Sequence, residues 1–185
     1  MWDLARAQAR AGATVTVLTT DVRAPHDRLP VGESHLDGVR IIRVRNVSGL
    51  LRSWLQVSTP LAIGRRAREL FAASAPGIVH FHELTTIENW RVAACTPAGV
   101  PLVVSTHGAS ACGGPVWLAH VQARLSRAVL ERVDHIMVES DDEIRALTAV
   151  WAGQRLTLDL ERVSVISADT DAASTAIARV YARLV

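Results

Sequence analysis

The sequence predicts an α/β domain built on a parallel, doubly wound β-sheet with helices on both faces. Segments typical of strands and of helices alternate along the chain, which is the order that such a sheet requires. The strand-like segments are continuous apolar runs, as expected for strands that are buried on both faces. Hydrophobic residues make up 49% of the chain and the mean hydropathy is +0.20, which agrees with a buried sheet.

The length and composition limit the kinds of protein that this chain can be. A chain of 185 residues is long enough for one domain with its own core, or for a domain with extensions. It contains no run of about 18 apolar residues, and its charged, amphipathic start does not have the pattern of a signal peptide. Cys95 and Cys112 form neither a CxxC pair nor a disulfide framework. We therefore expect a cytoplasmic protein without a transmembrane segment.

The charge pattern argues against a nucleic-acid-binding function. The net charge is +2, and every Lys or Arg position is arginine. The basic residues are scattered apart from short runs at 40–45 and 65–68, and neither run is interleaved with aromatic residues. Such runs are typical of a strand end and of a solvated helix face, so no nucleic-acid partner is expected.

The first half of the chain contains two predicted strands between helices. Gly12 follows the first helix and suits the left-handed residue that ends a helix. Pro60 stands near the start of another helix, where its missing N–H costs little. The expected elements are a helix at 4–11, a strand at 14–20, a loop at 21–37, a strand at 39–45, an ambiguous segment at 47–58 and a helix at 60–74.

The second half continues the alternation of strands and helices. Ser140 is a good N-cap, and the acidic residues that follow it stand at the end of a helix that favours negative charge. The expected elements are strands at 78–82, 100–106, 135–139 and 163–166, helices at 86–94, 116–133, 141–150 and 172–184, and a glycine-rich loop at 107–115.

The predicted order opens on a helix, whereas a doubly wound sheet normally opens on its central strand. Without that strand, backbone groups of the sheet would lose their hydrogen-bond partners. We therefore expect that strand 14–20 either pairs directly with strand 78–82 or leaves a gap beside it.

Several segments, in order, resemble the N-terminal domain of family 4 glycosyltransferases, which have the GT-B fold. They are WDLARAQARAG at 2–12 followed by VTVLTT at 15–20, GVRIIRVR at 38–45, GIVHFHE at 77–83, AGVPLVVSTHG at 98–108, VDHIMVES at 133–140 and RVSVI at 162–166. Three of them are similar to the family patterns DVVHxH, GVPxVxxxHG and ADxxIxxS. Together these segments are specific for a family, and not for a donor or an acceptor.

The resemblance implies a Rossmann-like half of a GT-B enzyme. Family members transfer a hexosyl group from a nucleotide-sugar donor to an acceptor, with retention of anomeric configuration and without a cofactor. The sequence departs from the family pattern, because the family's first strand, its glycine-rich loop and its C-terminal donor domain have no counterpart here. We therefore expect an N-terminal domain at 1–166, followed at 167–185 by a linker and a helix similar to the family's terminal helix.

His107 is the candidate catalytic residue. It follows an apolar strand at the carboxyl edge of the predicted sheet, where open α/β folds bind ligands. The resemblance implies that this histidine faces the sugar, and a neutral imidazole can donate or accept a hydrogen bond there. The alternative is a histidine that only fixes a loop. Gly108 beside it allows a close approach of the backbone and is a substrate-binding candidate.

Three further residues are substrate-binding candidates: His82, Glu83 and Ser140. His82 and Glu83 end a predicted strand, and Ser140 ends the ADxxIxxS-like segment. His80 shares a strand face with His82, so a metal site with His107 is conceivable, but no carboxylate or cysteine has supporting spacing and we expect no metal. His80 is more simply interpreted as a buried imidazole bonded to the backbone.

Other polar groups have structural interpretations. Gly113 and Gly114 precede a predicted helix but match neither the Walker pattern nor GxGxxG, so a turn or an acceptor-side loop is expected rather than a phosphate site. Glu131 and Glu139 have the spacing of the family's paired donor glutamates without their surrounding residues, which indicates coincidence.

Two functions fit these observations. The first is a glycosyltransferase, incomplete or one part of a split enzyme, whose substrates are a nucleotide sugar and an unknown acceptor. The second is a degenerate, non-catalytic half that acts as a binding or interaction domain. The departures from the family pattern would expose apolar surface, which a partner chain or a second copy could cover.

Overall fold

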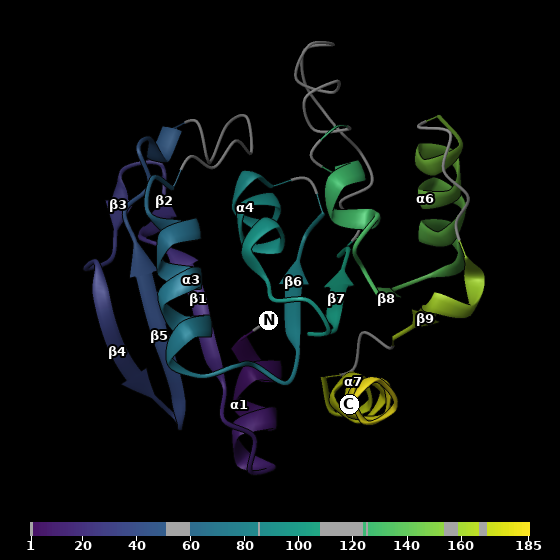
Figure 1. Cartoon of the computed structure of the whole chain (residues 1–185), viewed down its shortest axis with the longest axis horizontal. Helices are drawn as coiled ribbons and strands as arrows, with labels where there is room; N and C mark the ends of the chain where they lie inside the picture. Colours follow the sequence, from purple (N-terminus) through teal and green to yellow (C-terminus); the bar gives the residue numbers. More distant parts are fainter. Residues whose placement is uncertain are drawn as a thin grey trace.

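The computed structural model describes residues 2–50, 60–84, 86–107, 124, 126–153, 159–166 and 170–185. Several predicted features therefore lie outside the described residues: Gly108, Gly113, Gly114, Cys112, the ambiguous segment beyond residue 50, residue 85, most of the helix expected at 116–133 and residues 167–169 of the expected linker. Strands and helices alternate along the rest of the chain (Figure 1), which confirms the α/β fold class.

A parallel four-stranded sheet forms one half of the structure. Its order is β6–β7–β8–β9, and every neighbouring pair in it is parallel. Every residue of β7 and β8 is buried, as expected for central strands that are covered on both faces. Their bounds are Val79–His82 for β6, Leu102–Ser105 for β7, His135–Val138 for β8 and Val163–Val165 for β9.

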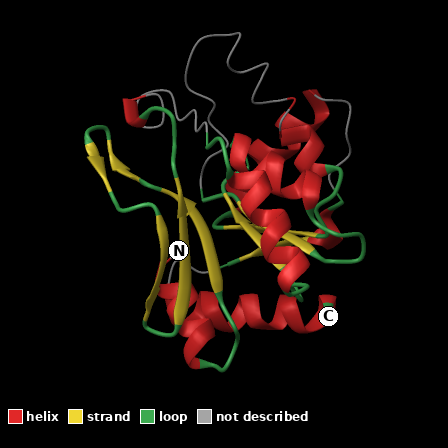
Figure 2. Ribbon diagram, turned by 60° about the vertical axis from the view of Figure 1, so that its left-hand side comes forward, coloured by secondary structure: helices red, strands yellow, loops and turns green. Residues whose placement is uncertain are grey.

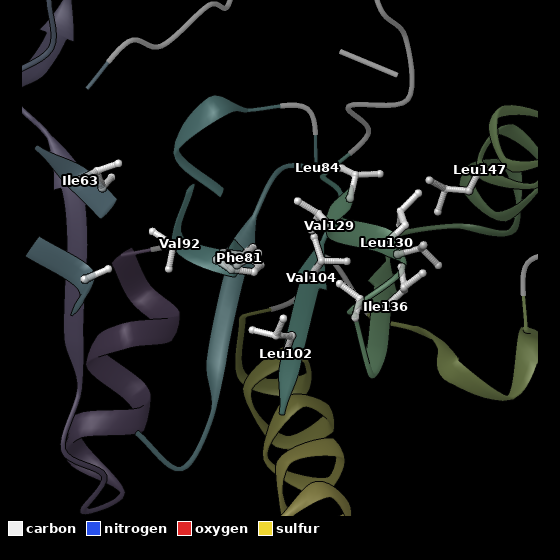
Figure 3. Packing of buried hydrophobic residues seen from close by; sticks show 14 of the residues in the cluster. Ile63, Phe81, Leu84, Val92, Leu102, Val104, Val129, Leu130, Ile136 and Leu147 are labelled. Carbon is white, nitrogen blue, oxygen red and sulfur yellow. The ribbon is translucent and has the colours of Figure 1, made fainter. Parts of the chain in front are cut away.

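Helices cover both faces of this sheet. Leu102 and Val104 of β7 face a core shared with α4 (Ile87–Cys95), the helical residues 126–130 and α6 (Asp141–Gly153). Figure 3 shows labelled side chains of this core. Val103 points the other way, because side chains alternate along a strand, and it packs on α7 (Thr170–Leu184).

A second sheet of three strands stands beside the first and has the order β1–β5–β4. Strands β1 (Thr16–Thr20) and β5 (Val39–Val44) are parallel, and β4 (Gly32–Leu36) pairs with β5 in the antiparallel direction. Helix α1 (Trp2–Arg10) packs through Ala5 on one face of β5. Helix α3 (Ile63–Ala73) lies on the other face, so this sheet is also covered on both sides.

The two sheets do not join in the described part of the chain. β1 pairs only with β5, and β6 pairs only with β7. A cavity of about 930 Å³ separates β1 from β6, and both strands line it along their length. Of the two arrangements expected from the sequence, the structure therefore has the gap. Contacts between α1 and α7, and between α3 and α4, connect the two halves (Figure 2).

The loop predicted at residues 21–37 is wrong, because most of this segment forms strands. β2 (Val22–Ala24) and β3 (Asp27–Arg28) make a small hairpin, and β4 follows them. A two-residue Asp37–Gly38 turn with positive φ angles of 50° and 81° connects β4 to β5. Such a turn fits the twist of a β-hairpin, and Asp-Gly is a preferred sequence for it.

The remaining helix boundaries agree with the sequence to within a few residues. Gly12 has a φ of 93° and ends α1 in the left-handed region, as expected. The Thr86 hydroxyl accepts a hydrogen bond from the Asn89 amide at the start of α4. No helix in the described ranges has both the length and the apolar character that a membrane crossing requires.

Candidate functional site

Polar side chains gather at the carboxyl edge of the four-stranded sheet. His82 is the last residue of β6, His107 comes shortly after β7 and Glu139 directly follows β8. Because these strands are parallel neighbours, their carboxyl ends meet at the same edge. This edge is the ligand-binding side of open α/β sheets.

His107 lies between an acid and a second histidine. Its Nδ1 is 2.9 Å from Oε1 of Glu139, and its Nε2 is 2.9 Å from Nδ1 of His82. The two imidazole rings are almost parallel, with an interplanar angle of 13° and centroids 5.2 Å apart. A carboxylate only accepts, so Nδ1 of His107 donates to Glu139. In a neutral His107, Nε2 then accepts the N–H of His82, which leaves Nε2 of His82 as an acceptor.

The local environment keeps His82 neutral. Burial, together with the neighbouring His107, lowers the pKa of His82 to about 4. An imidazole with this pKa carries no charge at pH 7, so it can exchange hydrogen bonds with hydroxyl groups without first losing a proton.

A second hydrogen-bonded group, centred on His80, packs against the His82 ring. Nδ1 of His80 is 2.6 Å from the Tyr181 hydroxyl of α7, and Nε2 of His80 is 2.8 Å from the Ser105 hydroxyl of β7. The His80 ring stacks on His82 with centroids 4.4 Å apart. Burial and the neighbouring imidazoles lower the pKa of His80 well below its usual range. The sequence-based expectation that the His80 ring bonds to the backbone is wrong, because both of its nitrogens bond to side chains.

The loops that carry His107 and Glu139 are fixed by one buried carboxylate. Glu143 accepts a hydrogen bond from the Thr106 hydroxyl with one oxygen, and from the Glu139 amide at 2.8 Å with the other. Its own amide donates to the Ser140 hydroxyl at 3.3 Å, which confirms Ser140 as the N-cap of α6. Glu143 thus ties the end of β7 to the end of β8 and limits the relative movement of the two loops.

Two residues at this edge have unusual backbone conformations. His107 has a φ of 46° and Glu83 a φ of 76°, both in the left-handed region that non-glycine residues rarely adopt. The Asn89 side-chain amide donates to the carbonyls of His82 and Glu83, which holds the turn after β6 in place. Such outliers persist where surrounding contacts determine the backbone, and they are frequent at functional sites.

The structure brings together only part of the residue set predicted from the sequence. His82 and His107 are hydrogen-bonded, and Glu83 adjoins His82 at the end of β6. Ser140 uses its hydroxyl to cap α6. Gly108 lies outside the described residues.

Sequence reasoning missed Glu139 and Tyr181 as members of this site. The position of Glu139 at a strand end, next to the strand of His107, was a signal that could have identified it. Glu131, its partner in the spacing noted above, instead forms an exposed ion pair with Arg127 at 2.7 Å. Tyr181 has no such signal, because only the packing of α7 brings it to His80.

The three neighbouring histidines do not converge on one point. Both ring nitrogens of His80 and of His107 already have hydrogen-bond partners, and the rings stack in a row. Among the described residues, no group of three or more His, Cys, Asp or Glu side chains is arranged to hold a metal ion.

Comparison with known proteins adds one finding. The family described as "Glycosyl transferase 4-like domain" matches residues 1–167, which is most of the chain. No curated protein matches the chain.

Proposed function

The chain belongs to the glycosyl transferase 4-like domain family, and on this premise we propose that it forms the acceptor-facing wall of a site for hexosyl transfer. The donor is a nucleotide sugar, and transfer retains the anomeric configuration. In this proposal another domain, on the same or on another polypeptide, supplies most of the groups that bind the donor. His107 is the residue that contacts the sugar.

The observation that carries the proposal is the Glu139–His107–His82 row at the carboxyl edge of the sheet. Glu139 selects the tautomer of His107 in which Nδ1 carries the proton. Nε2 of His107 therefore presents a lone pair, which a sugar hydroxyl can use in place of the N–H of His82. A ring oriented before the substrate arrives loses less entropy on binding than a freely rotating one.

His82 and Glu83 complete this wall in the proposal. His82 is neutral because of its lowered pKa, so its ring can donate to one hydroxyl and accept from another. Sugars present several adjacent hydroxyl groups, which can exchange hydrogen bonds with neutral imidazoles and donate to carboxylates. Ser140, which follows β8 after Glu139, remains a proposed substrate contact. Gly108, which lies outside the described residues, remains one as well.

Ligand binding tests this function most directly. The full chain is melted with and without UDP-glucose or GDP-mannose, and binding is quantified by isothermal titration calorimetry. A ligand that binds only the folded state raises the melting temperature, and at 100 times its Kd it adds about 2.7 kcal/mol of stability. We expect a shift with one of the nucleotide sugars, and at least tenfold weaker binding by His107→Ala, which is about 1.4 kcal/mol.

The matched control is His26→Gln, which changes an exposed histidine of the β2–β3 turn. It should bind like the unchanged chain. If His107→Ala and the unchanged chain bind the same nucleotide sugar equally well, His107 does not contact the sugar. If neither nucleotide sugar binds, even with a complementing donor domain present, the proposed glycosyl transfer is wrong.

A second candidate function is a binding domain without chemistry. The observation that favours it is the cavity between β1 and β6, which is large and lined by two sheet edges. This binding function does not require the histidine row to contact a substrate. Binding of a partner in the cavity, without binding of a sugar, would favour it over sugar transfer.

A further inference from the structure

Strand β4 stands at the solvent-exposed edge of the three-stranded sheet. Among the strands that the structure describes, it pairs only with β5. Figure 1 shows its arrow at the outer side of the structure, beyond β5. All its residues are exposed except Ser34, which is half-buried. The free side of such a strand presents backbone donors and acceptors on which another strand can pair.

The hydrogen bonds of β5 show which residues of β4 point outward. The Arg40 amide donates to the Val15 carbonyl, so Arg40 turns its backbone groups to β1 rather than to β4. His35 lies opposite Arg40 in the register of β4 and β5. It therefore occupies a non-hydrogen-bonded position and directs its own N–H and C=O groups away from β5. Because the two kinds of position alternate, Glu33 directs its backbone groups outward as well.

The outward residues are self-complementary about Ser34. When a second copy of β4 approaches in the antiparallel direction with Ser34 opposite Ser34, Glu33 of each copy faces His35 of the other. Facing residues that both point outward exchange both of their backbone hydrogen bonds. The imidazole N–H of His35 can also donate to the carboxylate of Glu33. Cross-strand pairs of this kind stabilise a sheet.

The flanking residues of this register also fit. Leu36 of one copy lies opposite Gly32 of the other. Leu36 is 53% exposed, and no heavy atom lies within 4 Å of the position that a Cβ of Gly32 would take. The Leu36 side chain can therefore lie over Gly32 of the second copy and lose part of its contact with water.

Other registers bring like groups together. Outward residues meet outward residues again only when one strand shifts by two residues. In one such shift Glu33 faces Glu33, and in the other Glu33 faces the acidic Asp37 while His35 faces His35. Like charges directly opposite each other destabilise a strand pair. Charge therefore favours the register that is centred on Ser34.

The charge of Glu33 does not by itself prevent this pairing, although charged edge residues often keep strands apart. Arg40 holds the Glu33 carboxylate through two bonds of 2.6 and 2.8 Å, and Arg66 of α3 lies 3.4 Å from it. The carboxylate is thus balanced and oriented by its own chain, and it retains lone pairs for a further donor.

We propose that β4 is a self-association surface, on which a second copy of this chain adds its own β4 in the antiparallel direction, centred on Ser34. The two three-stranded sheets then form one continuous sheet about a two-fold axis. A short edge buries a small area, so the dimer is weak and reversible rather than obligate. The proposal does not depend on sugar transfer, because β4 contributes nothing to the histidine row.

Cross-linking tests the register. At the two-fold axis the Ser34 Cα atoms are about 4.5 Å apart, which a disulfide can span. We expect Ser34→Cys to form a covalent dimer under mild oxidation at least tenfold faster than Leu36→Cys, measured on non-reducing gels. Leu36 is the matched control, because it faces Gly32 and its two copies are too far apart to bridge. The unchanged chain gives the background from Cys95 and Cys112.

Sedimentation velocity tests the backbone pairing. The full chain is measured at concentrations up to about 1 mM, where a weak dimer is populated. His35→Pro removes an outward N–H and keeps the bonds to β5, and proline is tolerated where the N–H of an edge strand faces solvent. It should weaken dimerisation at least tenfold, whereas His35→Gln keeps the N–H and should stay within twofold. Circular dichroism verifies that every variant folds.

Three outcomes would overturn the proposal. The first is a chain that stays monomeric at the highest concentration. The second is cross-linking of Ser34→Cys no faster than that of Leu36→Cys, which would place any dimer interface elsewhere. The third is dimerisation of His35→Pro as tight as that of the unchanged chain. If His35→Pro does not fold, the cross-linking comparison still decides.

Discussion

The hydroxyl of Tyr181 lies 2.6 Å from Nδ1 of His80 and joins the last helix of the chain to the first strand of the parallel sheet. Burial raises the pKa of Tyr181 to about 12, so the phenol keeps its proton, and its hydroxyl can donate to a histidine nitrogen or accept from one. The other nitrogen of His80 lies 2.8 Å from the Ser105 hydroxyl. One tyrosine thus helps to hold the ring of a histidine that stacks on the proposed substrate wall.

Removing this hydroxyl should destabilise the fold measurably. We expect Tyr181→Phe to lower the free energy of unfolding by about 1–2 kcal/mol, because Nδ1 of His80 loses its partner at a half-buried position. Urea denaturation measures the change. In a double-mutant cycle with His80→Gln, the two effects should be non-additive, since the residues share one bond. Full additivity would mean that the bond contributes nothing.

Stability should fall when the pH drops from about 6.5 to about 4. The pKa of His82 is about 4 in the folded chain and 6.5 as the ordinary value, so the unfolded chain binds more protons in this interval. The part of the free energy of unfolding that depends on a neutral His82 is fully present above pH 6.5 and is lost as the pH falls to about 4. Protonation of His82 lowers the free energy of unfolding by at most about 3 kcal/mol over this interval. Solvent screening reduces this value, because the side chain is not fully buried.

Denaturation at a series of pH values measures this dependence. His82→Gln should flatten the part of the curve between pH 6.5 and 4, and the exposed control His26→Gln should leave it unchanged. The same slope in all three proteins would show that other groups control acid unfolding.

Neutralising Glu139 should disturb His107 without unfolding the chain. In Glu139→Gln the side chain keeps an oxygen that can accept from Nδ1 of His107, but the hydrogen bond is no longer charge-assisted. We expect nucleotide-sugar binding to weaken about threefold, because the bond is partly exposed to solvent. Calorimetry gives the affinity, and ¹⁵N NMR of the imidazole gives the tautomer.

The control for this change is Glu131→Gln, which removes an exposed partner of Arg127 away from the sheet edge. It should leave both measurements unchanged. A His107 spectrum that is identical in Glu139→Gln and in the unchanged chain would contradict the assigned hydrogen bond.

The core of the parallel sheet should respond strongly to truncation. Leu102 is 1% exposed and packs between the strands and the helices above them. We expect Leu102→Ala to cost about 2–5 kcal/mol, from lost burial and the remaining cavity. Leu61→Ala removes the same atoms at a position that is 78% exposed and should change stability by less than about 0.5 kcal/mol. Equal effects in a urea titration would mean that Leu102 is not in the core.

The sequence was most informative where one physical signal dominated. The parallel strands β6 to β9 were predictable because they are short segments rich in apolar residues between turn residues. Strand β4 was missed because Gly32–Leu36 is polar and mostly exposed, so no apolar pattern marks it. The Asp37–Gly38 pair did signal a hairpin there, and Arg40 forms a bidentate bond to Glu33 across the two strands.

Only those residues of the candidate site that lie at strand ends could be predicted from the sequence. His82 and His107 follow from the rule that parallel strands end at one edge. Tyr181 and Glu143 reach the site through tertiary packing between segments far apart in the chain, which no local pattern encodes. The separation of β1 from β6 was foreseen as one of two possibilities, because the expected order began with a helix.

This separation affects how the molecule should unfold. No backbone ladder crosses from the three-stranded to the four-stranded sheet in the described residues. Side-chain packing of α1 on α7 and of α3 on α4 therefore has to couple the two halves. Each half is a candidate cooperative unit with its own opening free energy. Mild denaturant should then release the amides of β1, β4 and β5 to exchange before those of β7 and β8, as a subglobal step that precedes complete unfolding.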